Sequence, residues 1–451
     1  MPASSREAVR VAVLADSDTR WKWGALTARR ITTATAEPTG YVLRGRATPT
    51  ARQLAETGVS TTTPDEVTGA EFLRAVRDAE ARGEGYDVIV LALVGGTVRA
   101  VLQGLADLAL ERRPVIVTGY VGVVYEKLTD GLLLRHGADV VLANSRHDAE
   151  RFRGVYEGVG AGADSVVEAA LPFLGGAPYA PEAGRDSLVF AAQPSVPATR
   201  AERTYVLRRL IDHARLHPGR EVLLKLRSKP GEHTTHLEEF PFQKLVRELD
   251  PPANFRLVYG HMGEVLDRTD LLVTVSSTAA LEALHRRIPT AILTDLGVRE
   301  ALGNHHFVGS GLLTSFDALD KGLAPTPDEQ WLARQGVAAG DHSAGGDSSA
   351  GDHSAAGDSS AGGSYEAAFD AARDRVAALL ALPALPPITP YYTAETAPGY
   401  LPGILARHRL DVTAPEPRES GLRRIVREAA RGAYRHGVQR VAPVIRRLGE
   451  L

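Results

Sequence analysis

Short apolar runs alternate along this chain with helix-length amphipathic stretches, and this alternation constrains the fold more than any other feature. Val9–Ala15 is one such run, and helical patterns such as Glu71–Ala81 lie between successive runs. A parallel strand buried on both faces reads as a continuous apolar run, and the helices that connect such strands cover the sheet. The pattern predicts an α/β fold, and the other runs of the first half fit it: Gly40–Leu43, Tyr86–Leu93, Pro114–Thr118, Ala138–Ala143 and Ser165–Leu171.

A stretch rich in glycine and proline, Leu171–Gly184, interrupts the alternation, which begins again at Ser187. Such stretches are typical of connections between domains, and 451 residues are more than one hydrophobic core ordinarily supports. We therefore expect two doubly wound parallel-sheet domains, at 8–175 and 187–336, joined by a linker at 176–186. Ligands bind beyond the carboxyl ends of the strands in such domains, so two facing domains form a cleft.

The chain changes character after the second domain. Residues 337–364 consist largely of repeated Ala-Gly-Asp-His-Ser and Gly-Asp-Ser-Ser units. This composition cannot offset the entropy lost on ordering, so we predict a disordered low-complexity insertion. His342 and His353 then have no fixed geometry in which to bind a metal. A helix rich in alanine and leucine follows, and residues 365–410 are expected to form a crossover helix and loop against the two domains.

The last segment, residues 421–451, has the composition of a basic amphipathic helix. Its charged residues are mainly arginines, against two glutamates: Arg423, Arg424, Arg427, Arg431, Arg435, Arg440, Arg446 and Arg447. Helices of this kind lie on anionic membrane surfaces. They also occur as solvated helices that pack on the protein with their arginines outward. Both interpretations remain open.

Composition excludes several classes of function. A net charge of −3 gives no global attraction to nucleic acid, and the absence of cysteine rules out disulfides and thiolate chemistry. No apolar run is long enough for a secretory signal or for a span of the bilayer, which takes about 20 residues. We expect a cytoplasmic protein, peripheral at the inner face of the membrane if the basic helix binds lipid.

The most informative motif is a strand that breaks directly into a helix. The strand Asp270–Val275 is followed by Ser276-Ser277-Thr278 and then by the helix that starts at Ala279. Backbone N–H groups at a helix N-terminus, together with hydroxyl donors, bind phosphate without a metal. Serine and threonine are also the commonest N-caps, so an ordinary helix start is the alternative.

This motif has a relative among known enzymes. The run from Thr274 to Leu284, Thr-Val-Ser-Ser-Thr-Ala-Ala-Leu-Glu-Ala-Leu, and the pair Ile288-Pro289 resemble the donor-binding segment of GT-B glycosyltransferases of the capsule, sialyl- and polysialyltransferase-like group. The chain also resembles actinobacterial proteins presumed to be glycosyltransferases, over roughly residues 9–310. The resemblance implies a GT-B-like fold and a nucleotide-sugar donor such as a CMP-activated nonulosonic acid or Kdo-like sugar.

Enzymes of that group bind the donor phosphate with a His-Pro motif as well as with Ser-Ser. Here Lys229-Pro230 stands at the corresponding place, with lysine in the position of histidine. Lys225, Arg227 and Lys229 form a cationic strand end, and His236 follows in the loop. We expect these four side chains to bind the donor phosphate together with Ser276, Ser277 and Thr278. Solvated loop charges are the alternative.

Two further residues are expected at the donor nucleoside. His261 follows the strand Phe255–Tyr259, and Glu282 lies in the first turns of the helix after Thr278. A carboxylate accepts hydrogen bonds from hydroxyl groups, so Glu282 suits the ribose.

The first domain is expected to supply the acceptor side and the catalytic base. Asp16, Asp18 and Lys22 follow the first strand, at the end that faces the cleft in doubly wound domains. The resemblance places the general base in an acidic-acidic-Gly motif, which Thr129-Asp130-Gly131 matches only in part. Asp130 is therefore the first candidate for the base and Glu126 the second; a simple Asp-Gly turn is the alternative.

These expectations combine into one functional hypothesis. It is a metal-independent inverting glycosyltransferase that needs no cofactor, acts on a glycan or lipid-linked acceptor, and serves cell-surface glycopolymer synthesis. Two alternatives remain open. One is a UDP-sugar epimerase of the same architecture, and the other is a non-catalytic GT-B-shaped binding protein.

Overall fold

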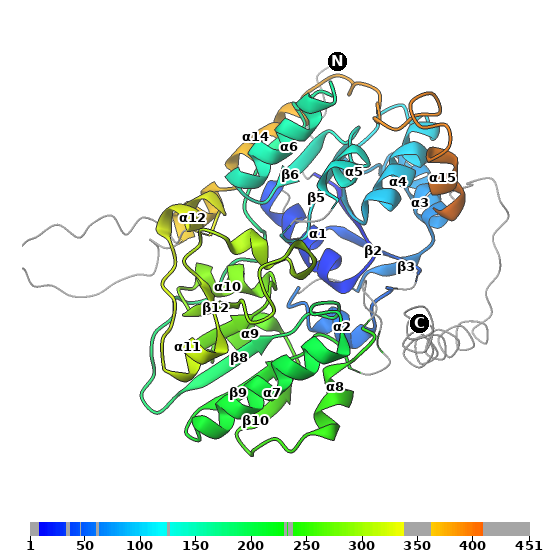
Figure 1. The fold of residues 1–451 in the computed structure, drawn as a ribbon. Helices are drawn as coiled ribbons and strands as arrows, with labels where there is room; N and C mark the ends of the chain where they lie inside the picture. The colour runs from blue at the N-terminus through cyan, green and yellow to red at the C-terminus, as the bar shows by residue number, and fades with distance from the viewer. Residues whose placement is uncertain are drawn as a thin grey trace, which may run out of the picture.

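The computed structural model describes residues 9–32, 37–45, 47–59, 63–123, 127–229, 232, 238–337 and 362–408. Two separate parallel sheets, each covered by helices, make up the two halves of the molecule (Figure 1). The α/β class, the parallel strands and the two doubly wound domains predicted from the alternation are confirmed. The basic helix predicted at 421–451 lies outside the described residues, as does most of the predicted insertion.

The first sheet has seven strands in the order β3-β2-β1-β4-β5-β6-β7. All adjacent strands pair in parallel. The strand order reverses direction on either side of β1, which puts the topological switch point between β1 and β4. The strands are β1 (Val11–Ala15), β2 (Thr39–Leu43), β3 (Asp65–Val67), β4 (Val88–Ala92), β5 (Val115–Gly119), β6 (Val140–Ala143) and β7 (Val166–Glu168).

The second sheet has six parallel strands in the order β10-β9-β8-β11-β12-β13, so its switch point lies between β8 and β11. The strands are β8 (Ser187–Ala191), β9 (Glu221–Lys225), β10 (Phe255–Val258), β11 (Leu271–Thr274), β12 (Thr290–Leu293) and β13 (Leu313–Thr314). The sequence analysis missed β3 and β13, because runs of three and two residues carry no usable periodicity.

Local sequence sets where the helices of the first domain begin. The Ser17 hydroxyl accepts the N–H of Arg20 at the start of α1, and Thr68 forms a capping box with Glu71 at the start of α3. The helices are α1 (Asp18–Ile31), α2 (Ala51–Ala55), α3 (Gly69–Ala81), α4 (Gly95–Asp107), α5 (Leu128–Leu133) and α6 (Arg146–Gly158).

The second domain has a longer leading helix and several short ones. They are α7 (Arg200–Leu216), α8 (Phe242–Leu245), α9 (Met262–Leu266), α10 (Ala279–His285), α11 (Phe316–Asp320) and α12 (Glu329–Arg334), with 3-10 turns η1 (Val246–Glu248), η2 (Glu300–Leu302) and η3 (Asn304–Phe307). In the part of the chain that the structure describes, no helix combines the length and apolarity needed to cross a bilayer.

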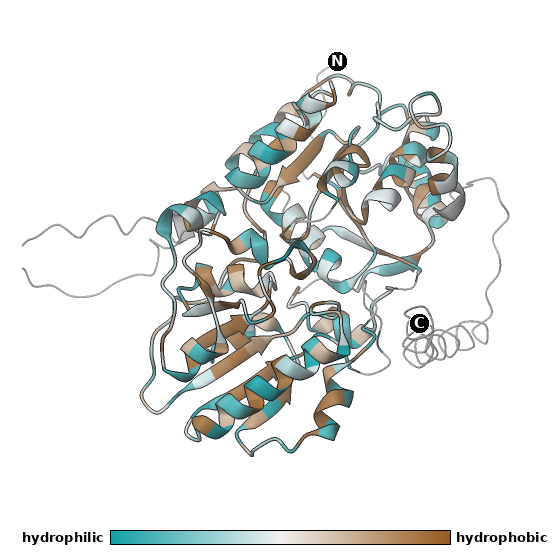
Figure 2. Cartoon of the chain, in the orientation of Figure 1, coloured by the Kyte–Doolittle hydropathy of each residue, from teal (hydrophilic) through white to brown (hydrophobic). Residues whose placement is uncertain are grey.

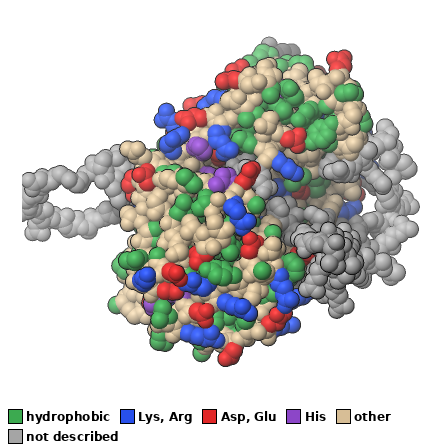
Figure 3. All heavy atoms as spheres, in the orientation of Figure 1, with side chains coloured by type: hydrophobic (Ala, Val, Ile, Leu, Met, Phe, Trp, Pro, Cys, Tyr) green, Lys and Arg blue, Asp and Glu red, His purple; other side chains and the backbone are tan. Residues whose placement is uncertain are grey.

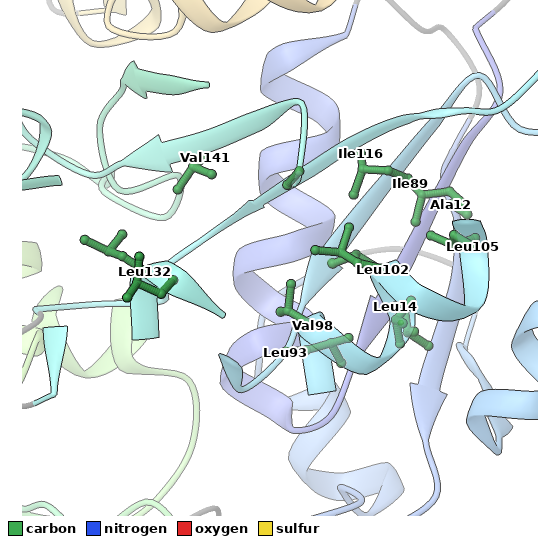
Figure 4. Packing of buried hydrophobic residues seen from close by; sticks show 14 of the residues in the cluster. Ala12, Leu14, Ile89, Leu93, Val98, Leu102, Leu105, Ile116, Leu132 and Val141 are labelled. Carbon is green, nitrogen blue, oxygen red and sulfur yellow. The ribbon is translucent and has the colours of Figure 1, made fainter. Parts of the chain in front are cut away.

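The central strands are buried on both faces, which explains their continuous apolar runs. Every residue of β1, β4 and β5 is buried. On one face, Leu14 and Ile89 of the sheet pack against Val98 and Leu102 of α4 (Figure 4). The strands are accordingly apolar in Figure 2, whereas the outward faces of the helices carry polar residues.

The C-terminal segment returns to the first domain. It comprises α13 (Gly362–Ala367), α14 (Asp370–Leu380) and α15 (Leu401–His408); α14 packs on α1 and on the β5–β7 edge of the sheet, and α15 packs on α4. Tyr365 lies between the domains, with its ring 5.0 Å from that of His285. Both ends of the segment predicted as an insertion, 337–364, lie in the described structure, since Val337 is buried and α13 begins at Gly362.

Candidate functional site

A cavity of about 790 Å³ opens between the two domains. Its walls include loops and helix starts that follow the strands at both switch points, with Asp18 and Lys22 of α1 after β1 and Gln193 after β8. Ligands of doubly wound domains bind at this place, beyond the carboxyl ends of strands on either side of the reversal. We refer to this cavity as the interdomain cleft.

The Ser-Ser-Thr turn after β11 reaches the interdomain cleft with two of its three residues. Ser277 and Thr278 line it. Ser276 does not, because it is 1% exposed and its hydroxyl donates to the carbonyl of Leu302 at 2.5 Å. The structure therefore assigns Ser276 a structural contact in place of the predicted phosphate contact.

The start of α10 is largely satisfied by the protein itself. The Ser277 hydroxyl accepts the N–H of Ala279 at 3.2 Å, and the backbone carbonyl of Ser277 accepts the N–H of Ala280 at 3.0 Å. Fewer backbone N–H groups are therefore available to a phosphate than the sequence predicts. The hydroxyls of Ser277 and Thr278 are the polar groups that this turn presents to the interdomain cleft.

Of the predicted cationic strand end, Lys225 and Arg227 line the interdomain cleft. Lys225 is 8% exposed, and its ammonium donates to the carbonyl of Leu226 at 3.0 Å. Burial is the main cause that lowers the pKa of Lys225 to about 8, although Glu56 acts in the opposite direction. Lys229 is exposed and lies outside the lining, and His236 lies outside the described residues.

Glu282 and His261, predicted at the nucleoside, both line the interdomain cleft. Glu282 pairs across the domains with Lys22, whose Nζ lies 3.4 Å from its Oε2. The same ammonium lies 4.8 Å from the ring centroid of Phe173, in a cation–π contact. Burial, followed by the charge of Lys22, lowers the pKa of His261, so its imidazole is neutral at pH 7.

Asp18, at the start of α1, lies opposite the cationic strand end and pairs with Arg227. The Nε of Arg227 donates to Oδ2 of Asp18 at 3.2 Å, and its Nη2 donates to Oδ1. Burial acts to raise the pKa of Asp18, but the charge and hydrogen bonds of Arg227 outweigh it and the pKa lies below its usual range. Asp18 is therefore an ionised carboxylate held at the junction of the domains.

A third ion pair joins the domains beside the first two. Arg52 of α2 pairs with Glu232, and with Glu56 on its own helix. Together with Asp18–Arg227 and Lys22–Glu282, this pair connects the helices α1 and α2 of the first domain to the second domain around the interdomain cleft.

Asp130, the first of the predicted catalytic bases, does not line the interdomain cleft. The carboxylate of Asp130 accepts hydrogen bonds from the hydroxyls of Tyr392 at 3.0 Å and Tyr400 at 3.1 Å, so it anchors the C-terminal segment. Glu126 lies outside the described residues. Asp130 lies in the first turn of α5, where its carboxylate contacts the returning segment.

Asp16 is also held away from the lining. Its carboxylate pairs with Arg20 at 2.8 Å and accepts the N–H of Val94 at 3.0 Å, which ties the ends of β1 and β4 together. Of the three residues predicted on the acceptor side, Asp18 and Lys22 reach the interdomain cleft and Asp16 does not.

Several lining residues were missed by the sequence analysis. Gln193 follows β8 and accepts the hydroxyl of Ser276 at 3.1 Å, and Tyr120 follows β5. Both residues follow the carboxyl end of a strand, and this position in the sequence is typical of ligand-binding residues in doubly wound domains. Glu56 follows the short helix α2, and nothing in its local sequence distinguishes it from a solvated charge.

One group of described side chains has the proximity needed for a metal. It consists of His213, His217 and Asp320, and it lies on α7 and α11, outside the lining of the interdomain cleft. Arg209 pairs with Asp320 at 3.0 Å, and Arg220 approaches Nε2 of His213 at 3.2 Å. The carboxylate of Asp320 is thus already paired with one guanidinium, and Nε2 of His213 faces another. The group is therefore described as a structural network of charged side chains.

Solved structures with a related arrangement have low similarity to this chain. A putative UDP-N-acetylglucosamine 2-epimerase from Listeria monocytogenes has 12% identity and a TM-score of 0.47, over 70% of this chain and 86% of that one. An Anabaena protein in complex with UDP and glucose has 14% identity and a TM-score of 0.42, over 72% and 92%. The glycotransferase of kitacinnamycin has 12% identity and a TM-score of 0.39, over 82% and 95%.

Comparison with families of related sequences gives a firmer result. No curated protein matches the chain. Residues 11–347, which contain both sheets and the whole of the interdomain cleft, match the family model described as "Putative glycosyltransferase (DUF6716)". The match covers more than half of the sequence, and the chain belongs to this family of putative glycosyltransferases.

Proposed function

We propose that this protein transfers a sugar from a nucleotide donor to a hydroxyl acceptor inside the interdomain cleft, with inversion and without a metal. One observation carries the proposal. The interdomain cleft brings hydroxyls and cations at the strand ends of the second domain opposite a partly buried, ionised carboxylate, Asp18, of the first. Phosphate recognition and base catalysis need these two kinds of group on facing walls.

The donor phosphate is proposed to bind between the Ser277-Thr278 turn and the β9 strand end. Lys225 and Arg227 supply positive charge in a partly buried setting, where charge-assisted hydrogen bonds are strong. They also stabilise the phosphate as it leaves, which is the part that a metal plays in other transferases. Glu282 and His261 also line the interdomain cleft and are proposed to contact the ribose and base.

Asp18 replaces Asp130 as the proposed general base. It takes the proton of the acceptor hydroxyl while that oxygen bonds to the anomeric carbon, and the bond from this carbon to the donor phosphate breaks. In the free protein its carboxylate is engaged by Arg227. The donor phosphate competes for the same guanidinium, so donor binding frees Asp18 for the acceptor.

The finer assignments follow from the resemblance of the Ser-Ser motif and remain proposals. They are a CMP-activated nonulosonic acid or Kdo-like donor, a glycan or lipid-linked acceptor, and a role in cell-surface glycopolymer synthesis. Lys229-Pro230 in place of His-Pro is the reason to test several nucleotides instead of CMP alone.

Calorimetric titration with CMP, CDP, UDP and GDP tests the donor site first. We expect one nucleotide to bind clearly more tightly than the others, and its activated sugars then enter assays with and without a glycan acceptor. Sugar transfer that depends on the acceptor supports the proposal. Conversion of the donor sugar without acceptor indicates an epimerase, and nucleotide binding without any turnover indicates a binding protein. Failure of every nucleotide to bind overturns the proposal.

A further inference from the structure

A second cavity, of about 300 Å³, lies between the domains and shares no lining residue with the interdomain cleft. Its walls come from α6 of the first domain and from η3 and α12 of the second. The lining residues are His147, Arg151, His305, His306, Val308, Trp331, Arg334 and Gln335. On the face shown in Figure 3, histidine side chains gather beside Lys and Arg side chains between the two halves of the molecule. We refer to this cavity as the histidine-arginine pocket.

The charge of the histidine-arginine pocket has one sign. Its lining contains two arginines and three histidines and no carboxylate. Both arginines have an acidic partner outside the lining: Glu150 pairs with Arg334 at 3.3 Å, and Asp148 lies 3.8 Å from Arg151. Asp148 is 5% exposed, and burial raises its pKa to about 6, so it is mostly ionised at pH 7 and loses its charge as the pH falls below 6.

The histidines show the effect of this positive surrounding. The ring centroids of His147 and His306 lie 6.4 Å apart across the domain boundary. The ring centroid of His306 lies 5.7 Å from that of Trp331. Burial, followed by the charges of His147, Arg151 and His305, lowers the pKa of His306 to about 3. Burial and the charges of Arg151 and Arg334 lower the pKa of His147, against the opposing charge of Glu150. The Nε2 atom of His306 is buried without a hydrogen-bond partner.

We propose that the histidine-arginine pocket binds a small phosphorylated organic molecule, of the sugar-phosphate class. Arg151 and Arg334 bind the phosphate, because guanidinium groups match phosphate oxygens in geometry and charge. Trp331 and the neutral His306 ring offer an aromatic wall and a polar atom to the organic part. A volume of about 300 Å³ exceeds what inorganic phosphate fills and is at the lower end for small-ligand pockets, which hold ~300–1,000 Å³.

Tryptophan fluorescence reports on this pocket selectively. The chain has three tryptophans, and Trp21 and Trp23 are buried in the core with 2% and 0% exposure. Only Trp331 lines the histidine-arginine pocket. We expect glucose 6-phosphate to change the fluorescence with saturation, inorganic phosphate to bind more weakly, and glucose to have no effect. Replacement of Trp331 by phenylalanine should remove the signal, whereas calorimetry should still detect the binding.

Variants locate the phosphate. Arg151→Ala and Arg334→Ala are each expected to weaken glucose 6-phosphate binding at least tenfold, with nucleotide affinity of the interdomain cleft unchanged. Arg146→Ala is the matched control, since Arg146 pairs with Glu150 on the same helix at 3.4 Å but does not line the pocket. It should leave the affinity within twofold of the parent.

The pH dependence supplies an independent readout. An anion raises the pKa of the facing His147, so binding takes up protons and strengthens as the pH falls from 8 toward the second phosphate pKa of about 6. Calorimetry in buffers of different ionisation enthalpy should show this uptake, and His147→Gln should reduce it. The proposal is overturned if glucose 6-phosphate does not bind, or if it binds equally well to the Arg151→Ala and Arg334→Ala variants. It is independent of the proposed transferase activity.

Discussion

Arg227 of the second domain and Asp18 of the first form an ion pair across the interdomain cleft, with Nε of Arg227 3.2 Å from Oδ2 of Asp18. The side chains are 30% and 13% exposed, so the pair is partly shielded from solvent. Both residues belong to the proposed catalytic machinery. A donor phosphate that binds Arg227 therefore has to displace a carboxylate that the protein itself provides.

Asp18→Asn is expected to raise nucleotide affinity several-fold and to abolish sugar transfer. The gain arises because the competing charge on Arg227 is removed; partly exposed ion pairs contribute on the order of 1 kcal/mol, and 1.4 kcal/mol corresponds to tenfold. Titration calorimetry measures the first effect and an acceptor-dependent transfer assay the second.

A double-mutant cycle with Arg227→Met separates competition from general repulsion between Asp18 and the phosphate. If Asp18 acts by occupying Arg227, Asp18→Asn no longer changes the affinity in the Arg227→Met background. A gain of the same size in both backgrounds would show that the ion pair is irrelevant to donor binding. Glu56→Gln serves as a control, because Glu56 lines the interdomain cleft but pairs with Arg52.

Replacement by alanine is expected to affect donor affinity at Ser277 and the stability of the fold at Ser276. Ser277→Ala should weaken donor binding about tenfold or more, since hydrogen bonds to charged groups contribute ~1.5–3 kcal/mol. Ser276→Ala should instead lower the free energy of unfolding by ~1–3 kcal/mol, because it leaves the buried carbonyl of Leu302 without its donor. Denaturant unfolding and calorimetry on both variants check this division, and equal losses of affinity would contradict it.

The sequence predicted the layers of this fold better than the details of its site. Continuous apolar runs such as β4 identify buried parallel strands because they depend on local composition. The Ser-Ser-Thr turn and the cationic end of β9 were placed correctly at strand ends for the same reason. Which of their side chains face the cleft depends on contacts with distant segments: Ser276 turns to Leu302, and Asp130 turns to Tyr392, 262 residues further along the chain. No local pattern encodes such contacts.

Asp130→Asn is expected to weaken the attachment of the C-terminal segment without impairing catalysis. Burial, together with the Asp130 carboxylate, raises the pKa of Tyr392, which keeps its hydroxyl protonated as a donor. With a neutral amide as acceptor, we expect a loss of ~1 kcal/mol in stability and faster proteolysis near residues 391–400. Tyr392→Phe should have a similar effect. Loss of turnover with stability and donor binding intact would reinstate Asp130 as the base and remove Asp18 from that role.

Lys225 makes donor binding dependent on pH above neutrality. Because burial lowers its pKa to about 8 in the free protein, Lys225 is mostly charged at pH 7 and mostly neutral at pH 9. A bound phosphate favours the ammonium and raises this pKa, so binding takes up a proton at pH values between the free and bound pKa. Affinity should be flat below pH 8 and fall by up to tenfold per pH unit above it.

Titration of the parent and of Lys225→Met with the same nucleotide between pH 6.5 and 9.5 tests this dependence, as the ionisation of the ligand cancels in the comparison. The variant should bind more weakly at pH 7, and its affinity should lack the decline above pH 8. The two curves should then converge at high pH, where the lysine of the parent has lost its charge. Parallel curves would show that Lys225 does not contact the phosphate, and the donor site would then rest on Arg227 and the Ser277-Thr278 turn alone.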